Sequence, residues 1–230
     1  MLVKNWMSKE VITIEVNDSM QEAMRLLKEH NIRMLPVMEN GKLVGVITDR
    51  DLKKASPSDA TTLEVHELLY LLTQIKVKEI MTEDPITVPP DYTVEETAQV
   101  LLENKISGAP VMDNTGKVIG TITQTDLFRV LIALTGVGSG GIQFGFHLED
   151  KPGSIKEVAD IIRQYGGRMV SILTSYDGVA DGYRHVYIRM RSIERSKLQS
   201  LKDKLSEKAA LLYMVDHREN KREIFSEHLK

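Results

Sequence analysis

The sequence contains an internal duplication, and no other feature limits the fold as strongly. At an offset of 74 residues, which places Met7 on Met81, identical residues recur along residues 7–38. They are Met7, Ile12, Thr13, Leu27, Glu29, Ile32, Pro36, Val37 and Met38. After one inserted residue near Thr115 the offset becomes 75, and identities follow at Gly41, Lys42, Gly45, Ile47, Thr48, Asp51 and Leu52. So many identities with a single gap predict two copies of one structural unit.

Each copy has the pattern of a βαββα unit. In the first copy, the apolar run 11–16 predicts a strand, and Ser19 with Glu22 has the capping-box spacing that starts a helix. Asn40-Gly41 between two apolar runs predicts a hairpin, and a second helix follows from Asp51. The second copy has its strand at 85–90, its capping box at Thr93 and Glu96, its turn at Asn114-Thr115-Gly116 and its second helix from Asp126. A unit of about 50 residues is too small to bury both faces of its sheet, so we expect the copies to pack by pseudo-twofold symmetry.

The segment between the copies predicts an ordered helical insertion. Ser56-Pro57-Ser58 indicates a turn, and Thr61 with Glu64 has the spacing to cap a helix. An apolar stripe follows at Leu68, Leu69 and Leu72. We expect this stripe to pack on the core of the repeats; the alternative is a contact between subunits.

A different pattern begins after the second copy. The glycine-rich residues 135–141 predict a linker rather than a phosphate-binding loop, because no Gly-Lys-Ser/Thr follows. Residues 142–217 then have the order βαββαβ, which is that of a ferredoxin-like domain, and Ser154 with Glu157 has capping-box spacing. The charged residues from Arg218 predict a frayed or exposed helix. The chain is thus expected to be mixed α/β (α+β), divided into residues 1–55 (first repeat), 56–76 (insertion), 77–134 (second repeat), 135–141 (linker), 142–217 (C-terminal domain) and 218–230 (charged tail).

The duplicated pattern Gly-apolar-apolar-Thr-x-x-Asp points to a ligand. It occurs as Thr48 with Asp51 and as Thr123 with Asp126, and it places Thr at the end of a strand and Asp in the first turn of a helix. Backbone N–H groups there favour an anion, and a carboxylate accepts two hydrogen bonds from a vicinal diol. A phosphorylated ribose has both groups. The alternative is that each Asp only caps its helix; we favour a ligand, because both residues recur together.

These residues give the two units a resemblance to CBS domains, whose pairs form Bateman modules, and "ISGAPVMDNTGKVIGTITQTDL" is an especially close match. The resemblance implies that Asp binds ribose hydroxyls, that Thr approaches phosphate, and that adenine lies against the Pro-Val strand of the other repeat. It thus implies two regulatory sites for AMP, ADP or ATP. The first would combine Thr123 and Asp126 with Thr13, Arg33, Met34, Leu35 and Pro36; the second would combine Thr48, Arg50 and Asp51 with Thr87, Ser107, Gly108, Ala109 and Pro110. Arg33 and Arg50 either contact phosphate or are simply solvated, and one of the two sites can be empty.

The C-terminal segment resembles an ACT domain through "LEDKPGSIKEVADIIRQYGG". That resemblance implies an amino-acid site at the loop between the first strand and first helix, formed by Asp150, Pro152, Gly153 and Ser154; the alternative is a turn that needs Pro and Gly for its geometry. Two CBS units, an ACT domain and the intervening "SPSDATTLEVHELLYLL" together resemble the acetoin utilization protein AcuB family. A link to acetoin catabolism is implied only by that resemblance.

Composition excludes several other classes of function. The chain has no cysteine, so it has no disulfide, thiolate metal site or cysteine nucleophile. Its histidines show no metal-ligand spacing on one predicted helix, so we predict no metal. A formal net charge of -3 with both signs interspersed gives no basic surface for nucleic acid. No apolar run approaches the roughly 18 residues of a membrane span, and there is no signal-peptide pattern, so we expect a cytoplasmic protein without membrane contacts.

The sequence therefore predicts a ligand sensor that is not an enzyme. We expect a homodimer that responds to an adenosine nucleotide and contacts an unknown protein target. The second hypothesis is a structural dimerisation subunit with non-functional pockets. The third is an enzyme that uses Asp51 or Asp126 as general base, which we do not favour because neither motif has a second acid-base partner.

Overall fold

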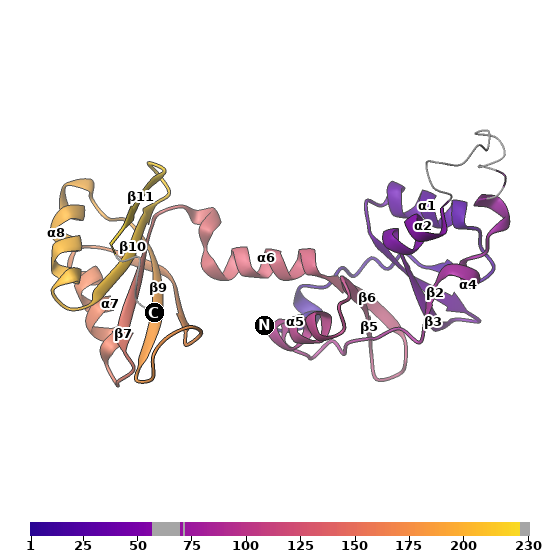
Figure 1. Ribbon diagram of the computed structural model, residues 1–230, viewed down its shortest axis with the longest axis horizontal. Coiled ribbons are helices and arrows are strands. Elements are labelled where there is room, and N and C mark those ends of the chain that lie inside the picture. The colour runs from indigo at the N-terminus through magenta and orange to yellow at the C-terminus, as the bar shows by residue number, and fades with distance from the viewer. Residues whose placement is uncertain (57–69, 71, 226–230) are drawn as a thin grey trace. The chain divides into compact units, whose positions relative to one another are not determined.

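The computed structural model describes residues 1–56, 70 and 72–225, and it divides into two compact units, Met1–Phe128 and Arg129–Lys230 (Figure 1). Within the described residues, no helix is long and apolar enough to cross a membrane.

The first repeat has the predicted βαββα order. Its elements are β1 (Ile14–Glu15), α1 (Met20–Glu29), β2 (Met34–Glu39), β3 (Lys42–Thr48) and α2 (Asp49–Ala55). Ser19 caps α1, since its Oγ accepts a hydrogen bond from the backbone N–H of Glu22 at 3.2 Å. Asn40 and Gly41 have φ of 51° and 76°, as a two-residue hairpin turn requires, and the predicted hairpin is confirmed.

The second repeat follows the same order except at its start. Its elements are α4 (Val77–Ile80), β4 (Thr82–Glu83), α5 (Val94–Glu103), β5 (Gly108–Met112), β6 (Val118–Thr123) and α6 (Gln124–Thr135). The strand predicted at 85–90 is wrong: the segment makes only an isolated parallel bridge between Val88 and Val111. Three of its six residues are proline, which has no N–H to donate to a sheet.

The two repeats exchange the segments that lead into them, residues 3–8 and residues 77–83, which are called here their entry segments. β4 pairs with β3 of the first repeat, and Val77 is buried in that repeat's core. Conversely, Val3 is fully buried in the core of the second repeat and donates its backbone N–H to the Tyr92 carbonyl at 2.9 Å. Ser8 forms a bridge with Thr121. Each sheet is therefore completed by the segment that precedes the other repeat.

Two glycines make this exchange sterically possible. A Cβ on Gly45 would lie 2.7 Å from the Met81 sulfur, and one on Gly120 would lie 2.5 Å from the Met7 sulfur. Both distances are below any normal contact, so each glycine admits the methionine of an exchanged segment. These are the same Met and Gly pairs that the duplication aligns, and they show that the pseudo-symmetry extends to the packing.

The insertion is only partly described. Leu72 is buried in the core of the first repeat, as predicted for the apolar stripe. Leu68 and Leu69, together with the predicted cap at Thr61 and Glu64, lie outside the described residues.

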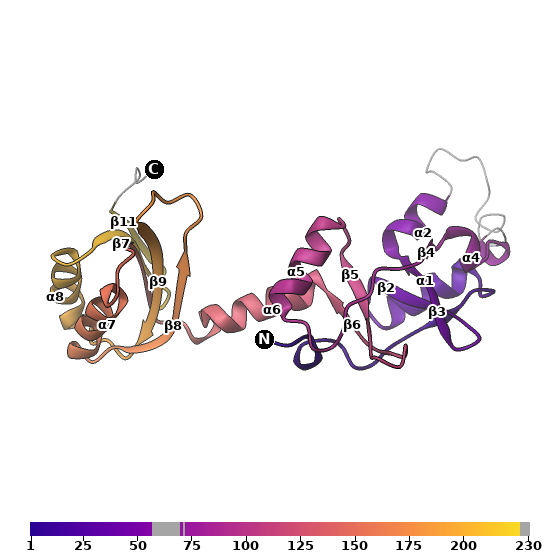
Figure 2. The same cartoon turned by 90° about the horizontal axis from the view of Figure 1, so that it is seen from below.

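The second unit is one antiparallel sheet covered by two helices. Its elements are β7 (Ile142–Glu149), α7 (Ser154–Gln164), β8 (Arg168–Ser175), β9 (Tyr183–Arg191), α8 (Arg195–Ser206), β10 (Ala210–Asp216) and β11 (Lys221–Ile224). The strand order is β11-β10-β7-β9-β8. Figures 1 and 2 show both helices on the same side of the sheet, where Phe144, Phe146, Ile188 and Leu201 form the centre of a core.

Two predictions for this unit are wrong. Residues 218–225 do not form a helix: Asn220 has φ of 51° and turns the chain, and β11 pairs with β10 from Asp216 opposite Lys221. Lys202 Nζ of α8 forms an ion pair with Glu223 Oε2 of β11 at 2.7 Å, and this contact holds the edge strand in place. The capping box at Ser154 and Glu157 is also absent, because Gly153, with φ of 90°, is the N-cap of α7 and Ser154 is its first residue.

Candidate functional site

The first Thr-Asp pair forms a complete capping box at the junction of β3 and α2. One carboxylate oxygen of Asp51, Oδ2, accepts hydrogen bonds from the Thr48 hydroxyl at 2.6 Å and from the Thr48 backbone N–H at 3.0 Å. The Asp51 N–H donates in return to Thr48 Oγ1 at 3.3 Å. The carboxylate is therefore held in one orientation at the first turn of α2, beside helix N–H groups that favour an anion.

The second pair has the same arrangement between β6 and α6. Oδ2 of Asp126 accepts from the Thr123 hydroxyl at 2.7 Å and from the Thr123 N–H at 2.9 Å. Asp126 is only 7% exposed, a low value for a carboxylate. In both copies the Thr hydroxyl and the Thr N–H therefore donate to the same Asp oxygen, Oδ2.

Each pair lies beside the Pro-Val strand of its own repeat. Met34 is opposite Thr48 across β2 and β3, and the Asp49 N–H donates to the Arg33 carbonyl at 3.2 Å. In the second repeat Gly108 is opposite Thr123, and the Gln124 N–H donates to the Ser107 carbonyl at 2.9 Å. Both hairpins also have a register shift at the equivalent place, Val37/Met38 and Val111/Met112. The two half-sites are therefore built alike.

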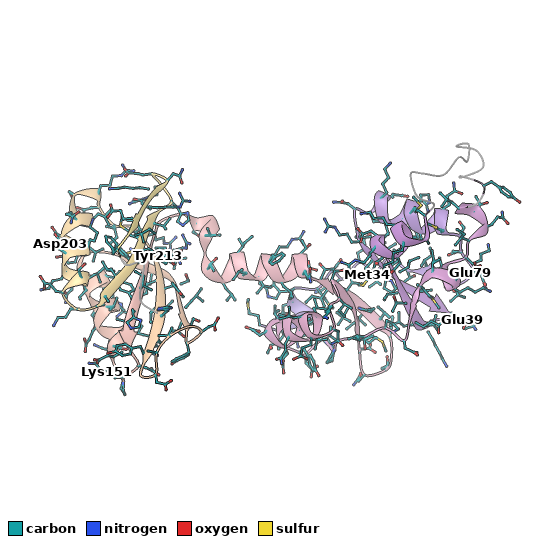
Figure 3. All side chains as sticks on the ribbon, in the orientation of Figure 1. Met34, Glu39, Glu79, Lys151, Asp203 and Tyr213 are labelled. Atoms are coloured by element: carbon teal, nitrogen blue, oxygen red, sulfur yellow. The ribbon has the colours of Figure 1, made fainter. Side chains whose placement is uncertain are left out.

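The other predicted site residues differ in their accessibility. Thr13, Arg33, Arg50 and Ser107 are exposed, and Thr87 is half-buried. The strand residues Met34, Leu35, Pro36, Gly108, Ala109 and Pro110 are buried. Figure 3 shows Met34 at the edge of the first repeat that lies nearest the second. That Thr and Asp of one repeat share a ligand with the strand of the other stays a prediction.

The two half-sites carry different charge. Asp49 and Arg50 lie between Thr48 and Asp51 in the chain, and Arg33 is linked to Asp49 through the backbone. The counterparts in the second copy are Ser107, Gln124 and Thr125. Among the described residues, no group of three or more His, Asp and Glu side chains is arranged to hold a metal ion. The arrangement can accept hydrogen bonds from a diol and offer helix N–H groups to a phosphate, with arginines only in the first copy.

The predicted ligand loop of the second unit borders a cavity. The cavity has a volume of about 420 Å³ and is lined by Asp150, Lys151, Pro152, Gly153, Ile155, Lys156 and Arg184. Ser154 is buried behind it and accepts a hydrogen bond from Arg184 Nη2 at 3.1 Å, while Arg184 Nη1 lies 3.4 Å from Asp150 Oδ1. The Glu149 carboxylate raises the pKa of Lys151.

Sequence reasoning missed Arg184. Its strand, β9, pairs with β7 so that Arg184 lies opposite Leu148, which places its side chain next to the loop that follows β7. A strand-pairing prediction would have found this neighbour, but the residue carries no local motif.

Comparison with known proteins identifies relatives of the first unit. The family model described as "CBS domain" matches residues 3–58 and 77–133. A CBS domain-containing protein of Dictyostelium discoideum is 37% identical over 132 residues, which is 57% of this chain and 91% of that protein. An inosine-5'-monophosphate dehydrogenase of Korarchaeum cryptofilum is 37% identical over 125 residues, but the match covers only 23% of that enzyme.

Solved structures of the same kind are also similar. The CBS domain pair of protein MJ0100, in complex with 5'-methylthioadenosine and S-adenosyl-L-methionine, is 36% identical, with a TM-score of 0.48. The match covers 57% of this chain and 95% of that one.

Proposed function

Because the chain belongs to the CBS domain family, we propose that its two repeats form a regulatory pair that binds an adenosine nucleotide, AMP, ADP or ATP. The nucleotide is a regulatory ligand and is not turned over. Its binding changes the contact of this protein with a protein target, because a ligand shifts a conformational equilibrium by its differential affinity for the two states.

One observation carries the proposal: the same Thr-Asp geometry is built twice. A helix cap needs no particular partner on the preceding strand and tolerates several residue types. Here both copies keep the same two residues, the same acceptor oxygen and the same backbone link to the strand that contains Pro36 or Pro110. In this proposal each carboxylate binds ribose hydroxyls.

The finer assignment follows the family resemblance. One site combines Thr123 and Asp126 with Thr13 and residues 33–36, and the other combines Thr48, Arg50 and Asp51 with Thr87 and residues 107–110. In this assignment each site contains one arginine of the first copy, Arg33 in the first site and Arg50 in the second, and each arginine would contact phosphate.

The second unit is proposed to be a ferredoxin-like ACT domain. Its βαββαβ order and its cavity at residues 150–156 support this assignment, and an amino acid would bind there. With the CBS pair, it makes the chain a cytoplasmic, AcuB-like regulator that works as a homodimer and has a link to acetoin utilization.

A structural dimerisation subunit is the second candidate, and α6 favours it. Phe128, Leu131, Ile132 and Leu134 on this helix are all exposed, with Phe128 exposed to 63%. Apolar side chains gathered on one helix are typical of a protein contact. In this alternative the pockets are empty, and Phe128→Asp dissociates the dimer in sedimentation equilibrium whether or not nucleotide is present.

Calorimetric titration with AMP, ADP and ATP tests the proposal on the full chain. Asp51→Ala and Asp126→Ala should each remove one nucleotide site, and the double variant should remove both. Glu96→Ala is the matched control, because it removes the corresponding capping residue of α5 in the same unit and should leave nucleotide affinity unchanged. Lack of any nucleotide binding up to millimolar concentration contradicts the function, whereas undiminished binding by the double variant contradicts only the site assignment.

A further inference from the structure

Arg189 is a buried cation on the face of the C-terminal sheet opposite α7 and α8. On β9 it alternates with Ile188 and Met190, which point into the core beneath α7 and α8, so Arg189 faces the other way. It is nevertheless only 3% exposed. Burial lowers the pKa of Arg189, which reports the cost of removing its charge from water.

Every acceptor of the Arg189 guanidinium is neutral. Nε donates to the Thr135 carbonyl at 2.8 Å, Nη1 to the Gly140 carbonyl at 3.3 Å, and Nη2 to Oε1 of Gln143 at 2.7 Å. Across the part of the chain that the structure describes, no carboxylate forms an ion pair with it. Thr135 ends α6, so the negative end of that helix compensates part of the charge. A guanidinium has five N–H donors, so two remain for a further partner.

The guanidinium lines a cavity whose charged lining side chains are all basic. The cavity has a volume of about 580 Å³, within the range of small-molecule sites, and none of its lining residues is acidic. Arg222 and His217 line it beside Arg189. The pKa of His217 is lowered, first by burial and then by these two arginines, which outweigh the opposing effect of Asp216. The potential inside the cavity is therefore positive.

The remaining walls are mostly apolar, with polar groups from Thr135, Gln143 and Tyr213. Leu131 and Ile132 of α6 form one side, and Tyr213 of β10 lies on the sheet (Figure 3). The Tyr213 oxygen accepts a hydrogen bond from Gln143 Nε2 at 3.3 Å, which leaves the phenol proton to donate. Figure 3 also shows Lys151, at the other cavity of this unit, well away from Tyr213, so the two cavities are distinct.

We infer that this cavity binds a small organic anion, a carboxylate with an apolar body. The carboxylate pairs with Arg189 and Arg222, and the body lies against Leu131 and Ile132. Such a ligand supplies the counter-ion that Arg189 lacks. The inference stands on the second unit alone and does not depend on nucleotide binding by the repeats.

Benzoate and benzamide are suitable probes, because they share size and shape but differ in charge. Titration of the full chain, followed by calorimetry and by amide chemical shifts, should show saturable benzoate binding, with the largest shifts in residues 131–143 and 213–222. Benzamide and inorganic phosphate should bind at least about tenfold more weakly, since each lacks either the charge or the apolar body. Equal binding of benzoate and benzamide, or no binding of benzoate, overturns the inference.

Three variants locate the site. Arg189→Lys keeps the charge but loses the planar fork, and should raise the benzoate dissociation constant roughly tenfold. Arg189 also donates a hydrogen bond to Thr135, the last residue of α6, so its replacement can disturb that helix. Arg222→Gln therefore provides a second test at an exposed position, and it should raise the benzoate dissociation constant about threefold. Arg191→Gln is the control, since Arg191 is exposed on the same strand and does not line the cavity. If Arg222→Gln and Arg191→Gln bind benzoate equally well, the assignment is wrong.

Discussion

At the scale of single residues, His147 on the sheet face opposite α7 and α8 has a lowered pKa. His147 stacks on Tyr183 with ring centroids 4.7 Å apart, and His185 lies 5.5 Å away. His147 Nδ1 and His185 Nε2 are both buried without a hydrogen-bond partner among the described residues. Burial, and then the proximity of His185, lowers the pKa of His147 below its ordinary value of 6.5. The native state therefore binds a proton at His147 less readily than the unfolded chain does.

This difference predicts a loss of stability on mild acidification. The contribution of His147 is fully present above 6.5 and is lost as the pH falls through the lowered pKa, because the unfolded state then takes up the proton. The melting temperature of the second unit should thus fall between about pH 7.5 and about pH 5.5. His147→Phe and His147→Gln should both reduce that fall, since neither side chain titrates. An unchanged pH profile in both variants contradicts the prediction.

At the scale of elements, the repeats depend on close contacts between exchanged segments. Besides the Met7 sulfur, a Cβ on Gly120 would lie 2.8 Å from the Ser8 carbonyl oxygen, and that backbone is fixed by its bridge to Thr121. A flexible methionine can move, but the carbonyl cannot do so without breaking the bridge. The glycine is therefore a condition for the pairing of Ser8 with β6.

Gly120→Ala should destabilise the first unit by about 1–3 kcal/mol through overpacking. Denaturant unfolding followed by Trp6 fluorescence measures this, because Trp6 is the one tryptophan of the chain and lies next to Met7. Gly138→Ala provides the control, since a Cβ there meets nothing within 4 Å. Equal midpoints for the two variants would mean that the exchanged segment does not pack as described.

The sequence predicted helices, turns and caps better than it predicted contacts between residues that are far apart in the chain. Capping at Ser19 and Thr93 and the turn at Asn40-Gly41 depend on neighbours within a few residues, so local pattern suffices. The bridge from Ser8 to Thr121 and the burial of Arg189 depend on residues far apart in the chain, and no local pattern encodes them. The charged tail from Arg218 was predicted to be a helix, yet an edge strand with one solvent-facing side accepts Lys221, Arg222 and Glu223.

The sequence likewise predicted some residues of the candidate sites and missed others. The duplicated Thr-Asp pairs stood out because repetition makes a weak motif visible. Arg184 and Arg189 occur once, on a strand with alternating polar residues, and only the sheet order shows what each of them faces.

At the scale of the whole molecule, the chain contains separate hydrophobic cores. The cores of the repeats and the core under α7 and α8 share no residue. Only the first unit contains tryptophan, whereas both units contribute to circular dichroism. Ligand binding to one unit therefore has a spectroscopic signature different from binding to the other.

We expect two unfolding transitions in the full chain. A nucleotide at 100 times its dissociation constant should stabilise the transition seen by Trp6 by about 2.7 kcal/mol and leave the second transition in place. Benzoate should do the reverse. A single transition that both ligands shift equally would show that the two units unfold together.

The exchange of entry segments also sets an order of events during synthesis. Residues 3–8 leave the ribosome early, but Ser8 finds its partner only when Thr121 has been made, 113 residues later. At the usual rate of about 5–20 residues per second, the interval is roughly 6 to 23 seconds. Throughout that time Val3 and Met7 lack the complete core of the second repeat, whereas the sheet of the first repeat can close earlier, as soon as β4 has been made.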